Sequence, residues 1–338
     1  MEEDAAHQMG KMVAKRHKPI VLHSLYNSAR PHSLDLCRYY NIPVYDSLDL
    51  ACKCMGVLAQ YGNYLKSYHG ITNFVLDWGA KAKQRAGSII STAREQGRLA
   101  LLEPECKEIL HLHGASTNSD CLTTSAGEAV AAAKEIGFPV VVKIVSPDIL
   151  HKSDANGVIL NLRNKNDVQQ AFSRLIKNAR QYKPEADIRG VLVSPMVKSG
   201  VEIIIGTKID EQFGPVIMYG LGGVMVEILK DISFRVLPIS RHSAKKMITE
   251  TKSAPILKGI RGNPPCDQKA LVHLLLQVSD IMEAYPDIQE MDLNPVILHE
   301  SGLSIVDARI ILKEQCLVDL NTPRVRPCED VIDHNKTT

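Results

Sequence analysis

The segment Pro139–Val145, with the letters PVVVKIV, limits the possible folds of this chain more than any other feature. Its β-branched residues favour an extended strand. A helix is predicted before it, from Ser125 with Glu128 three residues later as a capping box, to Gly137 as its C-terminal stop. A capped helix that leads into an apolar strand predicts a mixed α/β protein.

The same patterns predict further elements on both sides of this segment. The N-terminal part has two short β-rich runs, 18–25 and 42–45, that alternate with helical patterns at 31–40 and 47–65. Two strands make a poor sheet, so this part either joins a sheet elsewhere or ends a larger domain. Towards the C-terminus, strands are predicted at 190–194, 201–208, 215–219, 291–298 and 303–309, and helices at 105–112, 166–182, 243–252 and 267–284.

Composition excludes several classes of function. The 338 residues carry a formal net charge of +2 and only 5% aromatic residues, which argues against nucleic acid and membrane-surface partners. No apolar run reaches the roughly 18 residues of a membrane helix, and the charged N-terminus has no signal core, so we expect a cytoplasmic protein. A lone C-x-C at Cys52 and a lone H-x-H at His111 have no second pair at zinc-site spacing.

Three oxygen-bearing side chains near the C-terminus are predicted to hold a divalent cation. Asp292 and Asn294 lie two apart on a predicted strand and so share a face. If the turn is centred between Glu300 and Ser301, paired positions sum to 601 and Asn294 faces Asp307 across the hairpin. Mg²⁺ prefers such oxygen ligands. The alternative is an exposed polar hairpin face.

Two basic residues near the apolar strand are candidates for phosphate chemistry. Lys143 lies inside the strand and must either extend to the sheet rim or meet an anion. His151 follows in a polar loop that ends near Gly157 and resembles a phosphate-binding loop. A neutral imidazole can accept a phosphoryl group, although an ordinary surface histidine is the simpler interpretation.

A glycine-rich stretch and two charged residues are weaker candidates. Gly222 and Gly223 follow a predicted strand, as in phosphate-binding loops, but they can equally serve a tight turn. Arg235 could neutralise a transferring phosphate or pair with Asp231. Glu202, on a predicted strand, could bind ribose hydroxyls or simply be solvated.

Together, these motifs resemble one family. The order PVVVKIVSPDILHKSDANGV, GVLVSPMV, GVEIIIG, FGPVIMYGLGGVMVEILKD, MDLNPVIL and VDARI is similar to the ATP-grasp domain of the NDP-forming acyl-CoA synthetases. ADP-forming acetate–CoA ligases belong to that family, and succinyl-CoA synthetase is a relative. The resemblance covers about residues 101–312. It implies an α/β (α+β) chain with an ATP-grasp fold of two subdomains, preceded by a partial flavodoxin-like CoA-ligase segment.

The resemblance also implies roles for the candidate residues. ATP/ADP and Mg²⁺ are the expected ligands, with Lys143 on phosphate, Gly157 in a mobile loop, and Gly222 and Gly223 at the nucleotide. Glu202 lies in the nucleotide hinge. The remaining implied roles are the phosphohistidine relay at His151, charge neutralisation at Arg235, and metal ligation by Asp292, Asn294 and Asp307. The implied reaction joins a carboxylic acid and CoA at the expense of ATP, giving acyl-CoA, ADP and phosphate.

The resemblance implies a division of the chain into segments, and one part of the family pattern, the CoA-binding domain, is not matched. We expect a disordered leader at 1–17, a partial CoA-ligase-like segment at 18–69, a linker helix at 70–100, and a tail at 316–338. The ATP-grasp domain is expected at 101–315, with subdomains 101–185 and 186–315. Because the CoA-binding domain is absent, a CoA-binding alpha-type partner chain is expected. The alternatives are a truncated copy, another ATP-grasp carboxylate ligase, or a catalytically reduced nucleotide-binding subunit.

Overall fold

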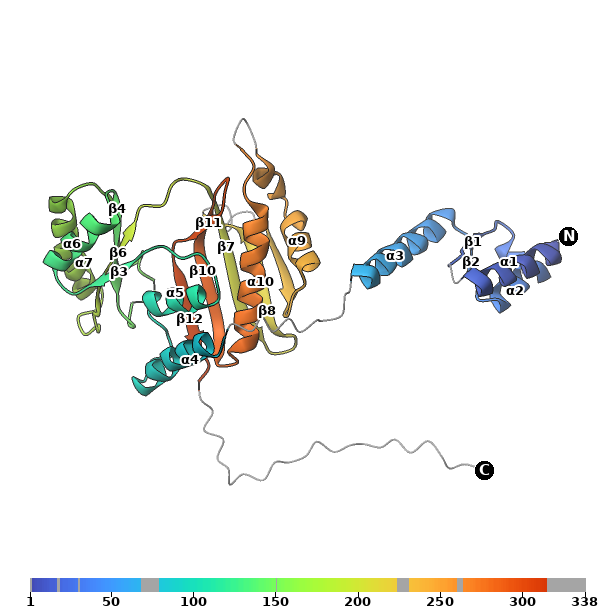
Figure 1. Cartoon of the computed structure of the whole chain (residues 1–338). Coiled ribbons are helices and arrows are strands. Elements are labelled where there is room, and N and C mark those ends of the chain that lie inside the picture. The colour runs from blue at the N-terminus through green and yellow to red at the C-terminus, as the bar shows by residue number, and fades with distance from the viewer. Residues whose placement is uncertain are drawn as a thin grey trace, which may run out of the picture. The chain divides into compact units, whose positions relative to one another are not determined.

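The computed structural model describes residues 2–16, 19–29, 31–67, 79–149, 151–223, 231–259 and 264–314 (Figure 1). By its internal contacts the chain divides into two units, residues 1–74 and 75–338. No described helix combines the length and the apolar character needed to cross a membrane. The tail expected at 316–338 lies outside the described residues.

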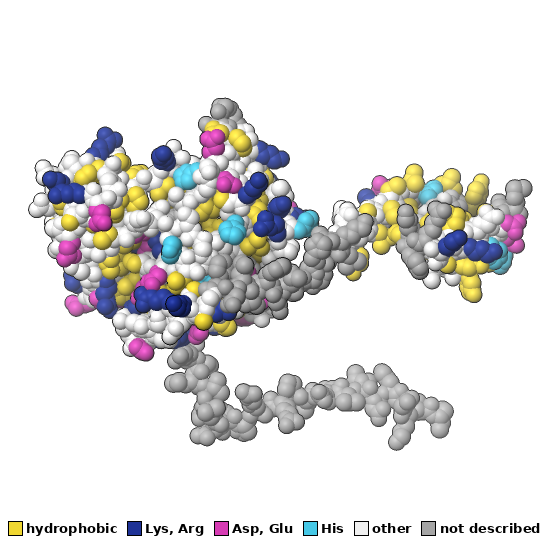
Figure 2. All heavy atoms as spheres, in the orientation of Figure 1, with side chains coloured by type: hydrophobic (Ala, Val, Ile, Leu, Met, Phe, Trp, Pro, Cys, Tyr) yellow, Lys and Arg dark blue, Asp and Glu magenta, His cyan; other side chains and the backbone are white. Residues whose placement is uncertain are grey.

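The N-terminal unit is a small α/β arrangement around two short parallel strands. Leu22 pairs with Val44, and His23 with Tyr45. Its elements are α1 (Glu2–Arg16), β1 (Leu22–His23), η1 (Asn27–Ala29), α2 (His32–Tyr39), β2 (Val44–Tyr45) and α3 (Leu48–Ser67). Hydrophobic side chains are prominent on its surface (Figure 2), among them Leu50, Val57, Leu58 and Tyr61 of α3.

The first helix of this unit corrects the expectation of a disordered leader over 1–17. Ala6 on α1 is buried and forms a small core with Cys37 and Ile42. Met9 and Val13 pack against the same core, so the apolar positions of α1 recur at intervals of three and four residues. This narrow stripe is easily overlooked in a sequence that is otherwise charged, but it is enough to fix one face of the helix.

The smaller sheet of the larger unit is built around a buried strand that has a neighbouring strand on each side. The predicted strand at 139–145 is β4, and every residue of it is buried. Helices α6 and α7 cover one face of this sheet, and their apolar side chains share its core (Figure 1). The strand order is β3–β6–β4–β5. The elements are β3 (Cys121–Thr123), α6 (Ala126–Ile136), β4 (Val140–Val145), β5 (Val158–Leu162), α7 (Lys165–Tyr182) and β6 (Gly190–Pro195).

The cap signals that the sequence gives for α6 are present in the structure. The Ser125 side chain accepts a hydrogen bond from the Glu128 backbone N–H, and Gly137 ends the helix at φ 92°. That φ lies in the region where glycine is favoured. The predicted Ser125 N-cap and Gly137 stop are therefore confirmed. The Glu128 carboxylate accepts a hydrogen bond from Thr124 N over 2.8 Å.

The second sheet of the larger unit is antiparallel, with the order β11–β10–β7–β8–β9, and β12 also pairs with β10. Helices α4, α5, α9 and α10 supply buried residues to its core. Its strands are β7 (Val201–Asp210), β8 (Gly214–Leu221), β9 (Ile232–Val236), β10 (Ile288–Leu298), β11 (Leu303–Ile305) and β12 (Ala308–Leu312). The helical elements are α4 (Gly79–Glu95), α5 (Glu103–Leu112), α9 (Arg241–Glu250), η2 (Ala254–Lys258) and α10 (Gln268–Ala284).

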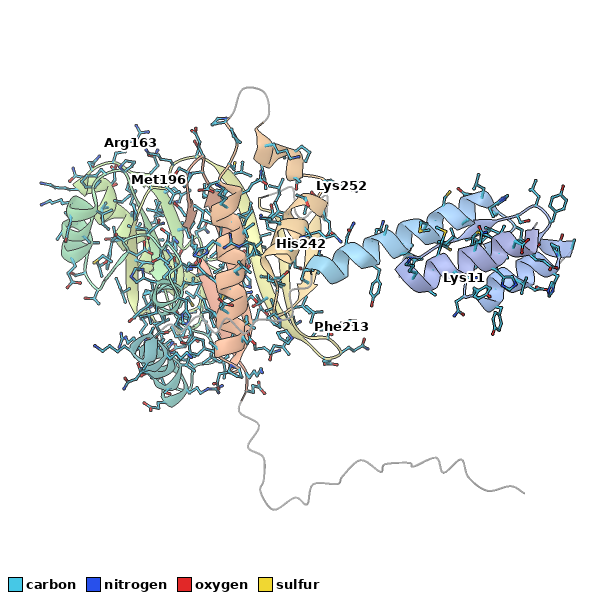
Figure 3. All side chains as sticks on the ribbon, turned by 45° about the vertical axis from the view of Figure 1, so that its right-hand side comes forward. Lys11, Arg163, Met196, Phe213, His242 and Lys252 are labelled. Carbon is cyan, nitrogen blue, oxygen red and sulfur yellow. The ribbon has the colours of Figure 1, made fainter. Side chains whose placement is uncertain are left out.

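Two expected segment boundaries differ from the structure. Strand β6 lies beyond residue 186 but pairs with β4, so the division between the sheets falls in the segment before β7. Met196 marks this connecting segment (Figure 3). Helix α4, expected within a linker at 70–100, buries Ala86, Ile89 and Ile90 in the core of the second sheet. Strand pairing therefore assigns β6 to the first sheet, and burial assigns α4 to the core of the second.

Candidate nucleotide and metal site

The hairpin register predicted from the sequence is present. Val296 pairs with Ile305, and Asp292 pairs with Arg309, so paired positions sum to 601 on both sides of Asn294. The ladder is interrupted between β11 and β12, where Val306 N donates to Pro295 O over 3.0 Å. This interruption places Asp307 opposite Asn294, outside regular pairing. Its side chain is therefore available to the neighbouring cavity.

A cavity of about 240 Å³ connects the two sheets of the larger unit at this point. The three predicted metal ligands line it from the second sheet, and His151 and Lys152 line it from the loop after β4. The other residues that line it are Leu101, Leu102, Glu103, Val145, Ser146, Ile149, Ser153, Asp154, Val158, Ala308 and Arg309. The structure therefore brings together four of the predicted site residues: His151, Asp292, Asn294 and Asp307.

A buried glutamate on α5 organises the charges beside this cavity. The side chain of Glu103 is 1% exposed and lies 2.6 Å from Lys143 Nζ, 2.7 Å from Lys152 Nζ and 2.9 Å from Lys107 Nζ. Lys143 and Lys107 also donate to the carbonyl of Val306, over 2.6 and 2.9 Å. Lys143 is thus held at the interrupted strand, one residue from Asp307.

The cluster continues from Glu103 to the predicted metal ligand Asp307. Lys152 Nζ lies 2.8 Å from both carboxylate oxygens of Asp307. Lys107 also pairs with Asp120. Three lysines therefore face three acids, which satisfies the requirement that buried charges be paired.

Burial and neighbouring charges shift the pKa values of these groups in opposite directions. Burial opposes ionisation of Glu103, but the three lysines outweigh it and hold its pKa well below the usual range. Burial raises the pKa of Asp307, as does repulsion from Glu103, against the opposing effect of Lys152. Burial also raises the pKa of Asp292, and Arg309 opposes that shift. A carboxyl group with a raised pKa gains from a nearby cation, as a metal ligand would.

The loop that carries His151 has one exposed end and one buried end. His151 is exposed at the start of the loop, whereas Gly157 is buried at its end. Gly157 N donates to Lys152 O over 2.7 Å, and Gly157 O accepts from Ile144 N over 2.8 Å. A Cβ on Gly157 would lie 2.6 Å from Ile144 Cγ2, so a larger residue requires a backbone shift. Gly157 therefore anchors the loop to β4.

Glu202 on β7 and Gly222 and Gly223 just after β8 form a second group. Gly222 N donates to Glu202 O over 2.7 Å. A Cβ on Gly222 would lie 3.2 Å from Glu202 Cβ, and one on Gly223 would lie 3.1 Å from Glu202 Oε2. The glycines thus leave room for the glutamate. Strand β7, which carries Glu202, pairs with metal-ligand strand β10, but none of the three residues lines the cavity. Residues 224–230, which follow these glycines, lie outside the described residues.

Arg235 lies apart from the other predicted residues. It is on edge strand β9 and pairs with Glu250 of α9, not with Asp231 as the sequence allowed. Asp231 instead accepts hydrogen bonds from the backbone N–H groups of Lys252 and Ser253, each at 2.7 Å. Arg235 does not line the cavity.

The central residue of the site, Glu103, was not among the residues predicted from the sequence. A signal for it exists, because Glu103 and Lys107 are four apart on a helix whose buried face also contains Cys106 and Leu110. Two charged residues on a buried helical face require partners. The distant partners of Glu103 lie on β4 and on the loop after it, and only the folded chain shows them.

The donors at the cavity fit magnesium better than a transition metal. Within the described ranges, no three residues among histidine, cysteine, aspartate and glutamate are grouped to hold a metal ion. Asp292, Asn294 and Asp307 offer two carboxylates and one amide oxygen. Mg²⁺ uses few protein oxygens and takes the rest of its ligands from phosphate and water. The adjacent lysines suit phosphate oxygens.

Comparison with known proteins agrees with this geometry. A family model described as an ATP-grasp domain matches residues 92–312. The chain belongs to the ATP-grasp family. Within that family it is 48% identical over 234 residues to the beta subunit of acetate–CoA ligase [ADP-forming] II of Pyrococcus furiosus. That alignment covers 68% of this chain and 99% of the relative.

Solved structures show the same ATP-grasp relationship. One is the dinucleotide-forming acetyl-coenzyme A synthetase 1 of Ca. Korarchaeum cryptofilum with coenzyme A, Ca-AMPCP and HgCl⁺, at a TM-score of 0.66 and 45% identity. Another is the same enzyme with coenzyme A and Mg-AMPPCP, its phosphohistidine segment pointing towards the nucleotide-binding site, at a TM-score of 0.60 and 43% identity. Each covers 68% of this chain and all of the solved chain. The ATP-grasp fold expected from the sequence is confirmed.

Proposed function

We propose that this chain is the ATP-binding, phosphoryl-transferring subunit of an ADP-forming acyl-CoA synthetase. The enzyme would convert a carboxylic acid, ATP and CoA into acyl-CoA, ADP and phosphate. The observation that supports this most is that His151, Lys152 and the three oxygen donors Asp292, Asn294 and Asp307 line the same cavity. A nucleophile, a cation and a donor set suited to Mg²⁺ meet there.

In the proposed first step, a neutral ring nitrogen of His151 attacks the γ-phosphorus of ATP. The new N–P bond forms as the bond to the bridging oxygen breaks, and ADP leaves with that electron pair. Asp292, Asn294 and Asp307 would hold Mg²⁺, which supplies positive charge that neutralises phosphate oxygens. Lys143 and Lys152 would add positive charge beside them.

The later steps pass the phosphoryl group from histidine to the acid. An oxygen of the carboxylate attacks phosphorus as the N–P bond breaks, which gives an acyl phosphate. The sulfur of CoA then attacks the acyl carbon, and inorganic phosphate leaves. Glu202 lies on β7, which pairs with metal-ligand strand β10, and Gly222 and Gly223 follow β8 beside it. These three residues are proposed to receive the nucleoside end of ATP.

A second chain is proposed to supply the CoA site. The matched relative of Pyrococcus furiosus is itself named as a beta subunit, which supports an assembly with a different chain. The exposed position of His151 also suits transfer to a site on another chain. We further propose that the assembly acts in the cytoplasm.

Transfer of labelled phosphate tests this function. The chain, purified with any chain that accompanies it, is incubated with [γ-³²P]ATP and Mg²⁺ and quenched in alkali. Acid-labile label on the wild type and its loss in His151→Ala are the expected results. His111→Ala removes another exposed histidine of the same unit and serves as the matched control. Persistent label in His151→Ala contradicts the relay. Acyl phosphate formation without labelled protein would indicate an ATP-grasp ligase that acts without a phosphohistidine.

A further inference from the structure

Lys152 contacts both a proposed metal ligand and the buried glutamate. Its ammonium lies 2.8 Å from each oxygen of Asp307 and 2.7 Å from Glu103 Oε2. Its side chain is only 14% exposed. An ammonium in this position competes with a divalent cation for the same carboxylate, because each needs the Asp307 oxygens as close partners.

The charge balance of the cluster decides when a divalent cation can displace the Lys152 ammonium from Asp307. Lys107, Lys143 and Lys152 are matched by Glu103, Asp120 and Asp307. A divalent cation that entered alone would add two positive charges beside six poorly solvated side chains whose charges already balance, which is unfavourable. The other acidic ligand, Asp292, already has the Arg309 guanidinium 3.9 Å away. Nucleotide phosphates bring the compensating negative charge. Glu103 offers Lys152 a second carboxylate, so the displaced ammonium keeps a partner.

We propose that Lys152 is a positioning residue of the metal site, whose ammonium holds Asp307 until metal and nucleotide enter together. The divalent cation then binds with nucleotide and not alone. This inference rests on the proposed function, since it takes Asp307 as a metal ligand. It adds a role for a lysine that follows the proposed nucleophile directly in the chain.

Binding of Mn²⁺ to the full chain tests the proposal without any turnover. Mn²⁺ shares the preference of Mg²⁺ for carboxylate and carbonyl oxygens, and its free form is measured by electron paramagnetic resonance. Lys152→Met is compared with Lys152→Arg, which keeps the charge. Lys183→Met is the matched control, because Lys183 also pairs with an aspartate, Asp148, at 2.8 Å but on the surface.

The expected result is a gain of metal binding when the charge is removed. Without nucleotide, Lys152→Met binds Mn²⁺ at least about tenfold more tightly than the wild type, a usual size for coupling between two sites. Lys152→Arg and Lys183→Met resemble the wild type, and adding Asp307→Asn to Lys152→Met removes the gain. A folded Lys152→Met with wild-type Mn²⁺ affinity overturns the proposal.

A measurement on the unaltered protein covers the case in which Lys152→Met fails to fold. ADP is expected to raise the Mn²⁺ affinity of the wild type at least about tenfold. Equal affinity with and without ADP overturns the proposal. The proposed function fails separately if Asp307→Asn leaves the binding of Mn²⁺ with ADP unchanged. If that binding depends on Asp307 but Lys152→Met shows no gain, only the role of Lys152 is wrong.

Discussion

Lys143 and Arg235 were both predicted to meet phosphate, yet the two regions that hold them differ in almost every physical respect. Lys143 lies on β4, which has a neighbouring strand on each side, and its side chain is 4% exposed. Arg235 lies on β9, at the edge of its sheet, and its side chain is 24% exposed. The function of a basic residue within a predicted strand therefore cannot be predicted until the position of that strand in the sheet is known.

The two regions also differ in how their charges are compensated. Glu103 serves three buried lysines at once, so removal of one group leaves several others without a partner. Arg235 pairs with Glu250, which also lies 3.6 Å from Lys246, and the side chains of Arg235 and Glu250 are 24% and 39% exposed. Buried charges are costly to leave unpaired, whereas pairs near the surface contribute little. The comparison therefore predicts a large effect in the first region and a small one in the second.

The largest effect is expected from Glu103→Gln. The substitution keeps the shape of the side chain but leaves Lys107, Lys143 and Lys152 facing only Asp120 and Asp307. We expect it to lower the free energy of unfolding by about 3–5 kcal/mol, the usual result of breaking a buried ion pair. Chemical denaturation followed by circular dichroism measures the change.

Glu108→Gln provides the control for this prediction on the same helix. Glu108 pairs with Arg85 at 2.6 Å, but the two side chains are 39% and 58% exposed. Its loss is expected to cost about 0.5 kcal/mol. Equal effects at Glu103 and Glu108 would mean that burial does not set the difference between the two regions.

The register of the metal-ligand hairpin shows what the sequence could predict. Turn residues and strand period together place Asn294 opposite Asp307, because pairing along a hairpin follows from local geometry. Glu103 could not be assigned in this way. Its partners Lys143 and Lys152 are 40 and 49 residues further along the chain, and no local pattern links a helix to a distant strand. The helical stripe of α1 was missed for a different reason, since only Ala6, Met9 and Val13 form it within an otherwise charged segment.

A second prediction concerns Asp280, a partly buried carboxyl group without the compensating cations of Glu103. Burial raises its pKa to about 6 from an ordinary value of 3.8, and the nearby Glu283 adds to the shift. At neutral pH the ionised form therefore destabilises the fold. Asp280→Asn is expected to stabilise the protein by about 1 kcal/mol, a value reduced to allow for solvent screening.

The effect of Asp280 depends on pH with a defined sign. Between pH 3.8 and about 6 the folded chain binds the proton more strongly than the unfolded chain, so this group contributes most stability in acid. That contribution is lost as the pH rises through about 6. The advantage of Asp280→Asn should appear above pH 6 and vanish below pH 4 in thermal unfolding. A constant advantage at all pH values would exclude titration of Asp280 as the cause. Glu283→Gln, which removes only the smaller contribution to the shift, should give a smaller gain in stability.

The smallest effect is expected from Arg235→Met, which removes the edge-strand partner of Glu250. The free energy of unfolding should fall by about 0.5 kcal/mol, because the pair is partly exposed. Arg189→Met, which breaks a surface pair with Asp187, should change it by a similar amount. Labelling of the chain by [γ-³²P]ATP should remain at the wild-type level, since Arg235 does not line the cavity with His151. A tenfold loss of labelling with stability intact would instead place Arg235 in the phosphoryl-transfer site. In that case, burial of a cation within the sheet would not distinguish catalytic positions from structural ones.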